Sequence, residues 1–342
     1  MSDGVRFCTT PDGLQLGYST FGTGRPLLIV PSWWMSPEAD RKRLTGRDFW
    51  NDLPAGSRTI AYDRRGIGVS TREVSDVSLE RQVDDLRALV EQLKLSSFDL
   101  WCFGDAAPIG VTYTVRFPEK PARLILYNPW SLNGSEARQR AAAMAPLIRA
   151  DWGLASRAFA QMLYPKGPLD AQESSTKAIR ETQSPETAQR YLDYCTSFDM
   201  REELEQLALP VLVISRQGPG REPLIPEESC RLVASTIPGA RYVAFESSKA
   251  MCPYYDYREY HGAVCQFLAD SGREMPLHTS LSRREVEVLG LVANGKTNAE
   301  IASLLVISRF TVDRHVSNIL AKTGCANRAE ASLYAARHSL IG

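Results

Sequence analysis

Histidine is scarce in this 342-residue chain, which contains four. Three of them, His278, His315 and His338, lie near the C-terminal end, so His261 is the one imidazole in the first 277 residues. Histidine is the side chain that most often serves as a general base near neutral pH. The scarcity therefore disfavours a histidine-dependent mechanism in the larger part of the protein.

The chain also lacks paired cysteines, long apolar runs and a leader-like start. Seven scattered cysteines without CxxC spacing predict reduced thiols and no metal site, with a redox sensor at Cys102 or Cys252 as the alternative. Apolar runs such as Leu27–Val30 and Val211–Ile214 have the length of strands and not of a membrane span. Met1–Gly4 carry neither a basic nor an apolar leader segment. We therefore expect a cytoplasmic protein that does not bind to or cross a membrane.

The formal net charge is zero, but the charges are unevenly distributed. From Leu277 onward there are eight Lys and Arg against five Asp and Glu, a balance of +3. The chain totals are 40 and 40, so 32 against 35 precede Leu277, a balance of −3. A basic end on an acidic body is consistent with a nucleic-acid-binding module. The length itself favours two domains.

Up to about residue 270, short apolar runs alternate with stretches of helical period. The runs predict strands at Leu14–Ser19, Leu27–Val30, Thr59–Tyr62, Phe98–Phe103, Leu124–Tyr127, Val211–Ile214 and Tyr242–Phe245. The other stretches predict helices at Leu79–Leu93, Ile109–Phe117, Pro226–Thr236 and Asp256–Leu268. This alternation indicates an α/β fold with a mostly parallel sheet covered on both faces. Residues 131–200 have a purely helical pattern and predict a cap over the carboxyl edge of the sheet, where ligands bind in such folds.

Residues 281–342 follow a short polar linker, 271–280, and carry repeated helix-start signals. Capping boxes occur at Ser282–Glu285, Thr297–Glu300 and Asn327–Glu330, and Ser308 begins a further helix. We therefore predict a small bundle of four helices. The residues expected to point inward from the second helix are Ile301, Leu304 and Leu305.

The stretches Leu281–Leu289, Gly295–Ala302 and Ser308–Gly324 closely resemble the LuxR/FixJ-type helix-turn-helix of transcription regulators. The resemblance covers nearly all of Leu281–Ile341. It implies a double-stranded DNA operator as partner, a recognition helix at Ser308–Thr323 and a homodimer paired through the last helix. It implies DNA-binding roles near base edges or phosphates for Thr297, Asn298, Ser308, Arg309, Thr311, Arg314, His315, Ser317, Asn318, Lys322 and Arg328, with Arg309, Arg314 and Ser317 near base edges. Asp313 stands where the family often has a basic residue.

The stretches Asp63–Ser70, Arg116–Glu119 and Ile237–Arg241 resemble the α/β-hydrolase family, and the resemblance spans residues 4 to 268. It implies an α/β-hydrolase fold with a helical cap in residues 1–270. The whole chain is thus expected to combine this sensor domain with an all-α, four-helix DNA-binding domain at 281–342.

Catalysis in the α/β-hydrolase family requires a nucleophile on the turn after the central strand, a histidine and an acid. Gly104 takes the nucleophile position, or Ala106 if a small deletion is allowed, and Ala250 takes that of the histidine. We therefore expect no catalysis and no cofactor. A shift by one residue would instead place Asp105 there, so an active hydrolase or dehalogenase-like enzyme tethered to DNA is the alternative.

Pro31–Trp34 stand where the oxyanion loop is expected, and they bring two indoles towards the degenerate site. The residues expected to line a ligand pocket are Ser32, Trp33, Trp34, Phe103, Gly104, Asp105, Trp130, Phe159, Met162, Tyr191, Tyr194, Ala250 and Met251. Such a pocket suits a small apolar or aromatic effector that controls DNA binding by the dimer. Two alternatives are that the aromatic residues merely fill the former active site, and that the domain serves only for dimerisation.

Overall fold

The computed structural model divides the chain into two compact units, Met1–Ser271 and Gly272–Gly342. It describes residues 4–42, 49–50, 52–130, 135–217, 226–246, 252–254, 257–270, 283–305, 307–323, 325 and 327–337. The predicted linker lies outside these ranges, as do Ala250 and Met251. Within them, no helix has both the length and the apolar character that a membrane span requires.

A mixed sheet forms the centre of the first unit. In the described ranges its eight strands follow the order β1-β2-β4-β3-β5-β6-β7-β8. The pairs β1–β2 and β2–β4 are antiparallel, and the other neighbouring pairs are parallel. The strands are β1 (Arg6–Thr9), β2 (Gln15–Phe21), β3 (Arg25–Val30), β4 (Ser57–Tyr62), β5 (Phe98–Phe103), β6 (Pro121–Tyr127), β7 (Val211–Gln217) and β8 (Arg241–Glu246). Every residue of β5 is buried, as expected for a parallel strand between two layers of helices.

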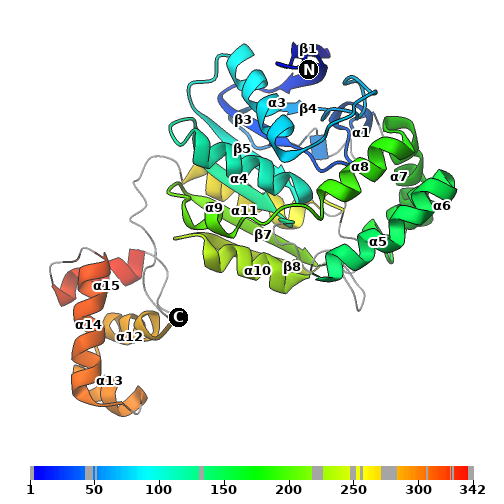
Figure 1. Cartoon of the computed structure of the whole chain (residues 1–342). Coiled ribbons are helices and arrows are strands. Elements are labelled where there is room, and N and C mark those ends of the chain that lie inside the picture. The colour runs from blue at the N-terminus through cyan, green and yellow to red at the C-terminus, as the bar shows by residue number, and fades with distance from the viewer. Residues whose placement is uncertain are drawn as a thin grey trace. The chain divides into compact units, whose positions relative to one another are not determined.

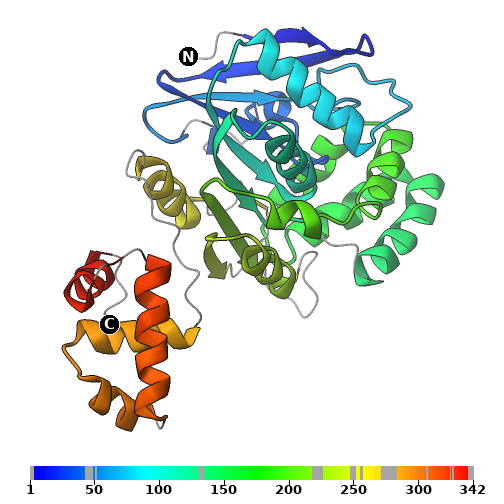
Figure 2. The same ribbon diagram turned by 60° about the vertical axis from the view of Figure 1, so that its left-hand side comes forward.

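Helices cover both faces of this sheet (Figures 1 and 2). On one face lie α3 (Leu79–Gln92), α4 (Ala107–Arg116) and α10 (Glu227–Thr236), and on the other lies α11 (Arg258–Ala269). The helices α5 to α8, which were expected to form a cap, are grouped beside the sheet. Two short helices, α1 and α9, are also present in the described ranges. These remaining elements are α1 (Pro37–Asp40), α5 (Ser135–Ala150), α6 (Trp152–Leu163), α7 (Leu169–Thr182), α8 (Pro185–Tyr194) and α9 (Arg201–Glu205).

The sequence pattern did not predict β1 or α7. β1 is an edge strand in which Phe7 is 51% exposed, so its apolar alternation is weak. α7 buries mainly small or polar side chains, namely Ala171, Ser175, Ala178, Ile179 and Thr182. A helix with such a buried face has little apolar periodicity in its sequence.

The second unit contains α12 (Arg283–Ala293), α13 (Asn298–Leu305), α14 (Arg309–Thr323) and α15 (Arg328–Arg337). Two of the expected capping boxes are present, since the N–H of Glu300 donates to Thr297 Oγ1 at 3.3 Å and that of Glu330 donates to Asn327 Oδ1 at 3.0 Å. The core consists of Val288, Leu289, Val292, Ile301, Val312, Ile319, Ala331 and Ala335.

The expectation that Leu304 points into this core is wrong, because its side chain is 57% exposed. Successive helical residues are about 100° apart, so Leu304 and Leu305 lie on opposite flanks of Ile301. Leu305 packs against the core and Leu304 does not. A helix this short buries one narrow stripe, and the apolar pattern alone does not indicate which flank faces the other helices.

Candidate functional site

The turn between β5 and α4 is where the resemblance to α/β-hydrolases places the nucleophile. Gly104 directly follows β5 and has φ 57°, a left-handed conformation that favours glycine. A Cβ at Gly104 would lie 3.4 Å from Ser32 Oγ, an ordinary contact distance, so the neighbouring side chains leave space for one. Because the residue in this left-handed conformation is a glycine, it has no side chain that could attack a substrate.

Asp105, the next residue, forms a buried ion pair with Arg64. The Arg64 Nη1 atom donates to Asp105 Oδ2 at 2.6 Å, and each side chain is 1% exposed. The other carboxylate oxygen, Oδ1, accepts from Ser32 Oγ and from the Trp33 N–H at 3.2 Å. Both oxygens of the carboxylate are thus occupied by donors from the protein.

Arg64 has further partners that satisfy its guanidinium. Its Nε donates to Gln82 Oε1 at 2.8 Å, and its Nη1 also reaches the carbonyl of Pro31 at 3.2 Å. The rings of Tyr191 and Tyr194 lie 4.7 and 5.7 Å from the guanidinium carbon. Burial disfavours the charged form, but the nearby Asp105 outweighs it and raises the pKa of Arg64 above its usual value. The guanidinium of Arg64 therefore stays charged.

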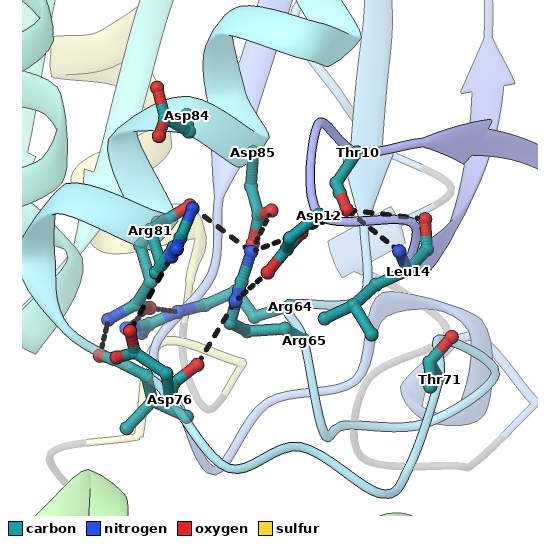
Figure 3. Close-up of polar contacts among 12 residues, drawn as sticks. Thr10, Asp12, Leu14, Arg64, Arg65, Thr71, Asp76, Arg81, Asp84 and Asp85 are labelled. Atoms are coloured by element: carbon teal, nitrogen blue, oxygen red, sulfur yellow. Dashed lines mark hydrogen bonds and ion pairs between the residues drawn. The ribbon is translucent and has the colours of Figure 1, made fainter.

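Arg65 extends to different partners, as Figure 3 shows. Its Nε and Nη2 donate to Asp85 of α3 at 2.7 and 2.6 Å, and its Nη1 donates to Asp12, in the turn between β1 and β2, at 3.0 Å. Its backbone carbonyl accepts from the hydroxyl of Tyr191 on α8 at 2.8 Å. The two consecutive arginines, which follow β4, thus connect this part of the chain to the turn between β1 and β2, to α3 and to α8 of the cap.

The aromatic residues predicted to line a pocket contact one another. The ring centroids of Trp33 and Phe159 are 4.9 Å apart, and Trp33 stacks on Tyr191 at 6.2 Å. Trp34 reaches Phe159 at 6.4 Å, and the Tyr194 hydroxyl donates to the Asp105 carbonyl at 3.1 Å. Trp33, Phe159, Tyr191 and Tyr194 are buried. We call these four residues with Trp34 the aromatic cluster.

The other predicted lining residues are less closely associated. Phe103 belongs to a separate group of rings, with Tyr127 at 5.3 Å and Trp101 at 4.9 Å. Trp130 is half-buried, and its N–H donates to the Gly104 carbonyl at 3.0 Å. Met162 is half-buried on α6.

The cysteines considered as redox sensors are both fully enclosed. Burial raises the pKa of Cys252 to about 12 and that of Cys102 above its usual value. A reactive thiol requires a lowered pKa and access to solvent. Neither residue has the environment of a redox sensor.

Sequence reasoning missed Arg64 and Gln82 as parts of the site. Arg64 belongs to the Asp63–Ser70 stretch that carries the hydrolase resemblance, and Gln82 lies within the predicted helix Leu79–Leu93. A buried carboxylate requires a cation or several donors, so Asp105 after a buried strand was the available signal. The sequence does not show which of its arginines supplies the charge.

In the second unit, the predicted recognition helix α14 exposes Arg309, Arg314, Ser317 and Asn318, while Thr311 and His315 are half-buried. Ser308 accepts from the Thr311 N–H at 3.1 Å and thereby caps the helix. Lys322 lies on α14, and its side chain is outside the described residues.

Two residues expected to face phosphates bind to each other. The Arg328 Nη1 atom donates to Asn298 Oδ1 at 2.8 Å, and its Nη2 donates to the Lys296 carbonyl. Asn298 Nδ2 in turn donates to Asp313 Oδ1 at 2.6 Å. Asp313, which departs from the family pattern, is therefore part of a chain of contacts among α13, α14 and α15.

The C-terminal residues match a family model described as bacterial regulatory proteins of the luxR family, over residues 279–335. The chain is 44% identical over 80 residues to the transcriptional regulatory protein LiaR of Bacillus subtilis, covering 23% of this chain and 38% of LiaR. It is 48% identical over 65 residues to the response regulator VraR of Staphylococcus aureus, covering 19% of this chain and 31% of VraR. The match thus spans about a third of the length of these relatives.

The N-terminal part resembles solved hydrolase structures. An esterase from Exiguobacterium antarcticum superposes with a TM-score of 0.66 at 18% identity, covering 77% of this chain and 98% of the esterase. A bromoperoxidase from Bacillus anthracis superposes with a TM-score of 0.66 at 17% identity, covering 78% of this chain and 100% of that protein. At this identity the likeness establishes the fold alone. The chain therefore carries a luxR-family helix-turn-helix domain at its C-terminal end, preceded by a domain with the α/β-hydrolase fold.

Proposed function

We propose that this protein is a DNA-binding transcription regulator whose hydrolase-like domain regulates and does not catalyse. The observation that carries the proposal is the buried Arg64–Asp105 ion pair next to Gly104. It occupies the part of the fold where an enzyme would hold its nucleophile, and it leaves no free reactive group there among the described residues.

A missing base supports the same conclusion. His261, the one histidine of the first unit, is half-buried on α11, with its ring nitrogens 3.6 and 3.7 Å from Cys265 Sγ. The expected histidine position, Ala250, lies outside the described residues and stays a prediction. Catalysis through Asp105 would require that carboxylate to leave Arg64 and to become accessible, so the dehalogenase-like alternative is disfavoured.

For DNA binding we assign base-edge roles by exposure on α14 and keep the phosphate roles that the family resemblance implies. Arg309, Arg314 and Ser317 are exposed and suit contacts to base edges in the major groove. Positions suited to phosphate contacts are Thr297, Thr311, His315, Asn318 and Lys322. We assign Asn298 and Arg328 instead to holding the helices together, because they are hydrogen-bonded to each other.

A homodimer paired through α15 and a small apolar or aromatic effector complete the proposal. Because the aromatic cluster is packed, an effector would have to enter by displacing Phe159 on α6 from Trp33. Such binding changes DNA affinity only if the effector prefers one arrangement of the dimer. We place the protein in the cytoplasm, where a bacterial DNA-binding regulator meets its operator.

The test uses the full-length protein in two assays. Genomic fragments retained by the protein should share a sequence, which Arg314→Ala should bind less selectively. Ester and haloalkane substrates should show no multiple turnover. Turnover that disappears in Asp105→Ala would overturn the non-catalytic assignment, and retention of unrelated fragments only would overturn the regulatory one.

A further inference from the structure

A groove of about 810 Å³ runs between α6 and α7 of the cap. The two helices are neighbours at the edge of the first unit in Figure 1. The groove lies on the opposite side of α6 from Phe159, because Arg157 and Gln161 line it and each is about 160° around the helix from Phe159. Its volume falls within the range of small-molecule sites in proteins. It is thus separate from the aromatic cluster.

One face of α7 lines this groove. The residues of α7 that line it recur every three or four positions and form a single stripe: Leu169, Gln172, Glu173, Thr176, Lys177, Arg180 and Glu181. The opposite face, with Ala178 and Ile179, is buried against the protein. The helices α6 and α7 pack against each other, and each buries small side chains, such as Ala155 on α6 and Ser175 on α7.

The charges around the groove favour an anion. Lys177 is paired with Glu181 at 3.7 Å. Arg157 and Arg180 have no ion pair or hydrogen bond within the described part of the chain. Glu173, the other lining carboxylate, lies seven residues from Arg180, or about 10 Å along the helix axis. Asp151 is near Arg180, but its Oδ1 accepts from the Leu154 N–H at 2.9 Å and caps α6.

An apolar surface lies next to these cations. Trp152 begins α6 and lines the groove at the end where Arg180 approaches Gly153. A groove lined by an indole ring and two guanidinium groups offers a flat apolar contact together with charge-assisted hydrogen bonds. We propose that the groove between α6 and α7 binds a small organic anion, with its carboxylate or sulfonate at Arg157 and Arg180 and its apolar body against Trp152.

The test compares two fluorescent probes on the full-length protein without DNA. 8-Anilinonaphthalene-1-sulfonate carries the anionic group, and N-phenyl-1-naphthylamine has the same ring system without it. Arg157→Gln combined with Arg180→Gln should weaken the sulfonate by about fivefold to tenfold and leave the neutral probe unchanged, since each exposed charge contact contributes modestly. Thr176→Trp, which fills the groove, should weaken both probes.

Arg231→Gln is the matched control, because it removes an exposed arginine of α10 that lies outside the groove. Its sulfonate affinity should equal that of the unchanged protein. Equal sulfonate binding by the double arginine variant, equal loss of both probes in it, or no sulfonate binding to the unchanged protein would each overturn the proposal. Since no DNA is present, these outcomes are independent of the regulatory function proposed above.

Discussion

Arg64 Nη1 and Asp105 Oδ2 are 2.6 Å apart in a region where each side chain is 1% exposed. Two buried charges of opposite sign at this distance depend on each other. Removal of one leaves the other without its opposite charge in a medium of low polarity, which costs far more than an exposed ion pair contributes.

Arg64→Met should lower the free energy of unfolding by about 3–5 kcal/mol, because the Asp105 carboxylate stays buried without the positive charge that balances it. Combining it with Asp105→Asn should recover part of that loss. Urea unfolding measures both. Arg87→Met, which breaks the exposed pair with Asp84, is the control and should cost less than about 1 kcal/mol. A loss in Arg64→Met no larger than in the control would contradict the assignment.

Gly104→Ser tests the turn after β5. A side chain has room beside Ser32, but the left-handed backbone is strained for serine, so we expect a loss of roughly 1–3 kcal/mol in unfolding free energy. Ester turnover should stay at the uncatalysed level, because no histidine base activates the new hydroxyl. A burst of product followed by turnover would show that a base is available.

The pH dependence of stability should contain a contribution from Asp63. Burial raises the pKa of this carboxyl to about 7, although it accepts from Ser36 Oγ at 2.9 Å and the Val69 N–H at 2.8 Å. The folded state then binds more protons than the unfolded state between about pH 4 and 7, so stability falls as the pH rises through that window. The slope from one such group is at most about 1.4 kcal/mol per pH unit.

Asp63→Asn removes that titration. Unfolding measured from pH 4 to 8 should therefore show the unchanged protein losing stability relative to the variant as the pH rises. A difference between the two that does not vary with pH would mean that Asp63 has an ordinary pKa.

Two side chains of α14 should affect DNA binding differently. Arg314→Ala should relax sequence preference at one base pair, by about 1–3 kcal/mol of discrimination. Lys322→Ala should weaken all sequences alike and reduce the dependence of log affinity on log salt by about one. Fluorescence anisotropy with matched and mutated operators at several salt concentrations separates the two, and identical behaviour would exclude the assigned roles.

Arg328→Ala distinguishes a phosphate contact from an internal one. The bonds from Arg328 to Asn298 and to the Lys296 carbonyl predict faster amide hydrogen exchange in α13 and α15, with about 1–3 kcal/mol lost locally. The salt dependence of DNA binding should stay as in the unchanged protein. A reduction like that of Lys322→Ala would show that Arg328 contacts phosphate.

The sequence alone determined the features that arise from local physics. The strand Phe98–Phe103 was predicted with the observed bounds, because an apolar run of that length between turn signals fits a buried parallel strand. Capping boxes located the starts of α13 and α15, since a cap is formed by residues three positions apart. The absence of a serine after β5 and the scarcity of histidine were also visible in the residues themselves.

Tertiary structure decided the partners, because the contacting atoms come from distant positions in the chain. The ion pair of Arg64 with Asp105 joins residues 41 positions apart, and Arg328 reaches Asn298 across 30. A buried carboxylate requires a cation or several donors, and the fold determines which residues of the chain supply them. The groove between α6 and α7 was likewise not visible in the sequence. Because α7 buries mainly small or polar side chains, its sequence has little apolar periodicity and did not predict a helix.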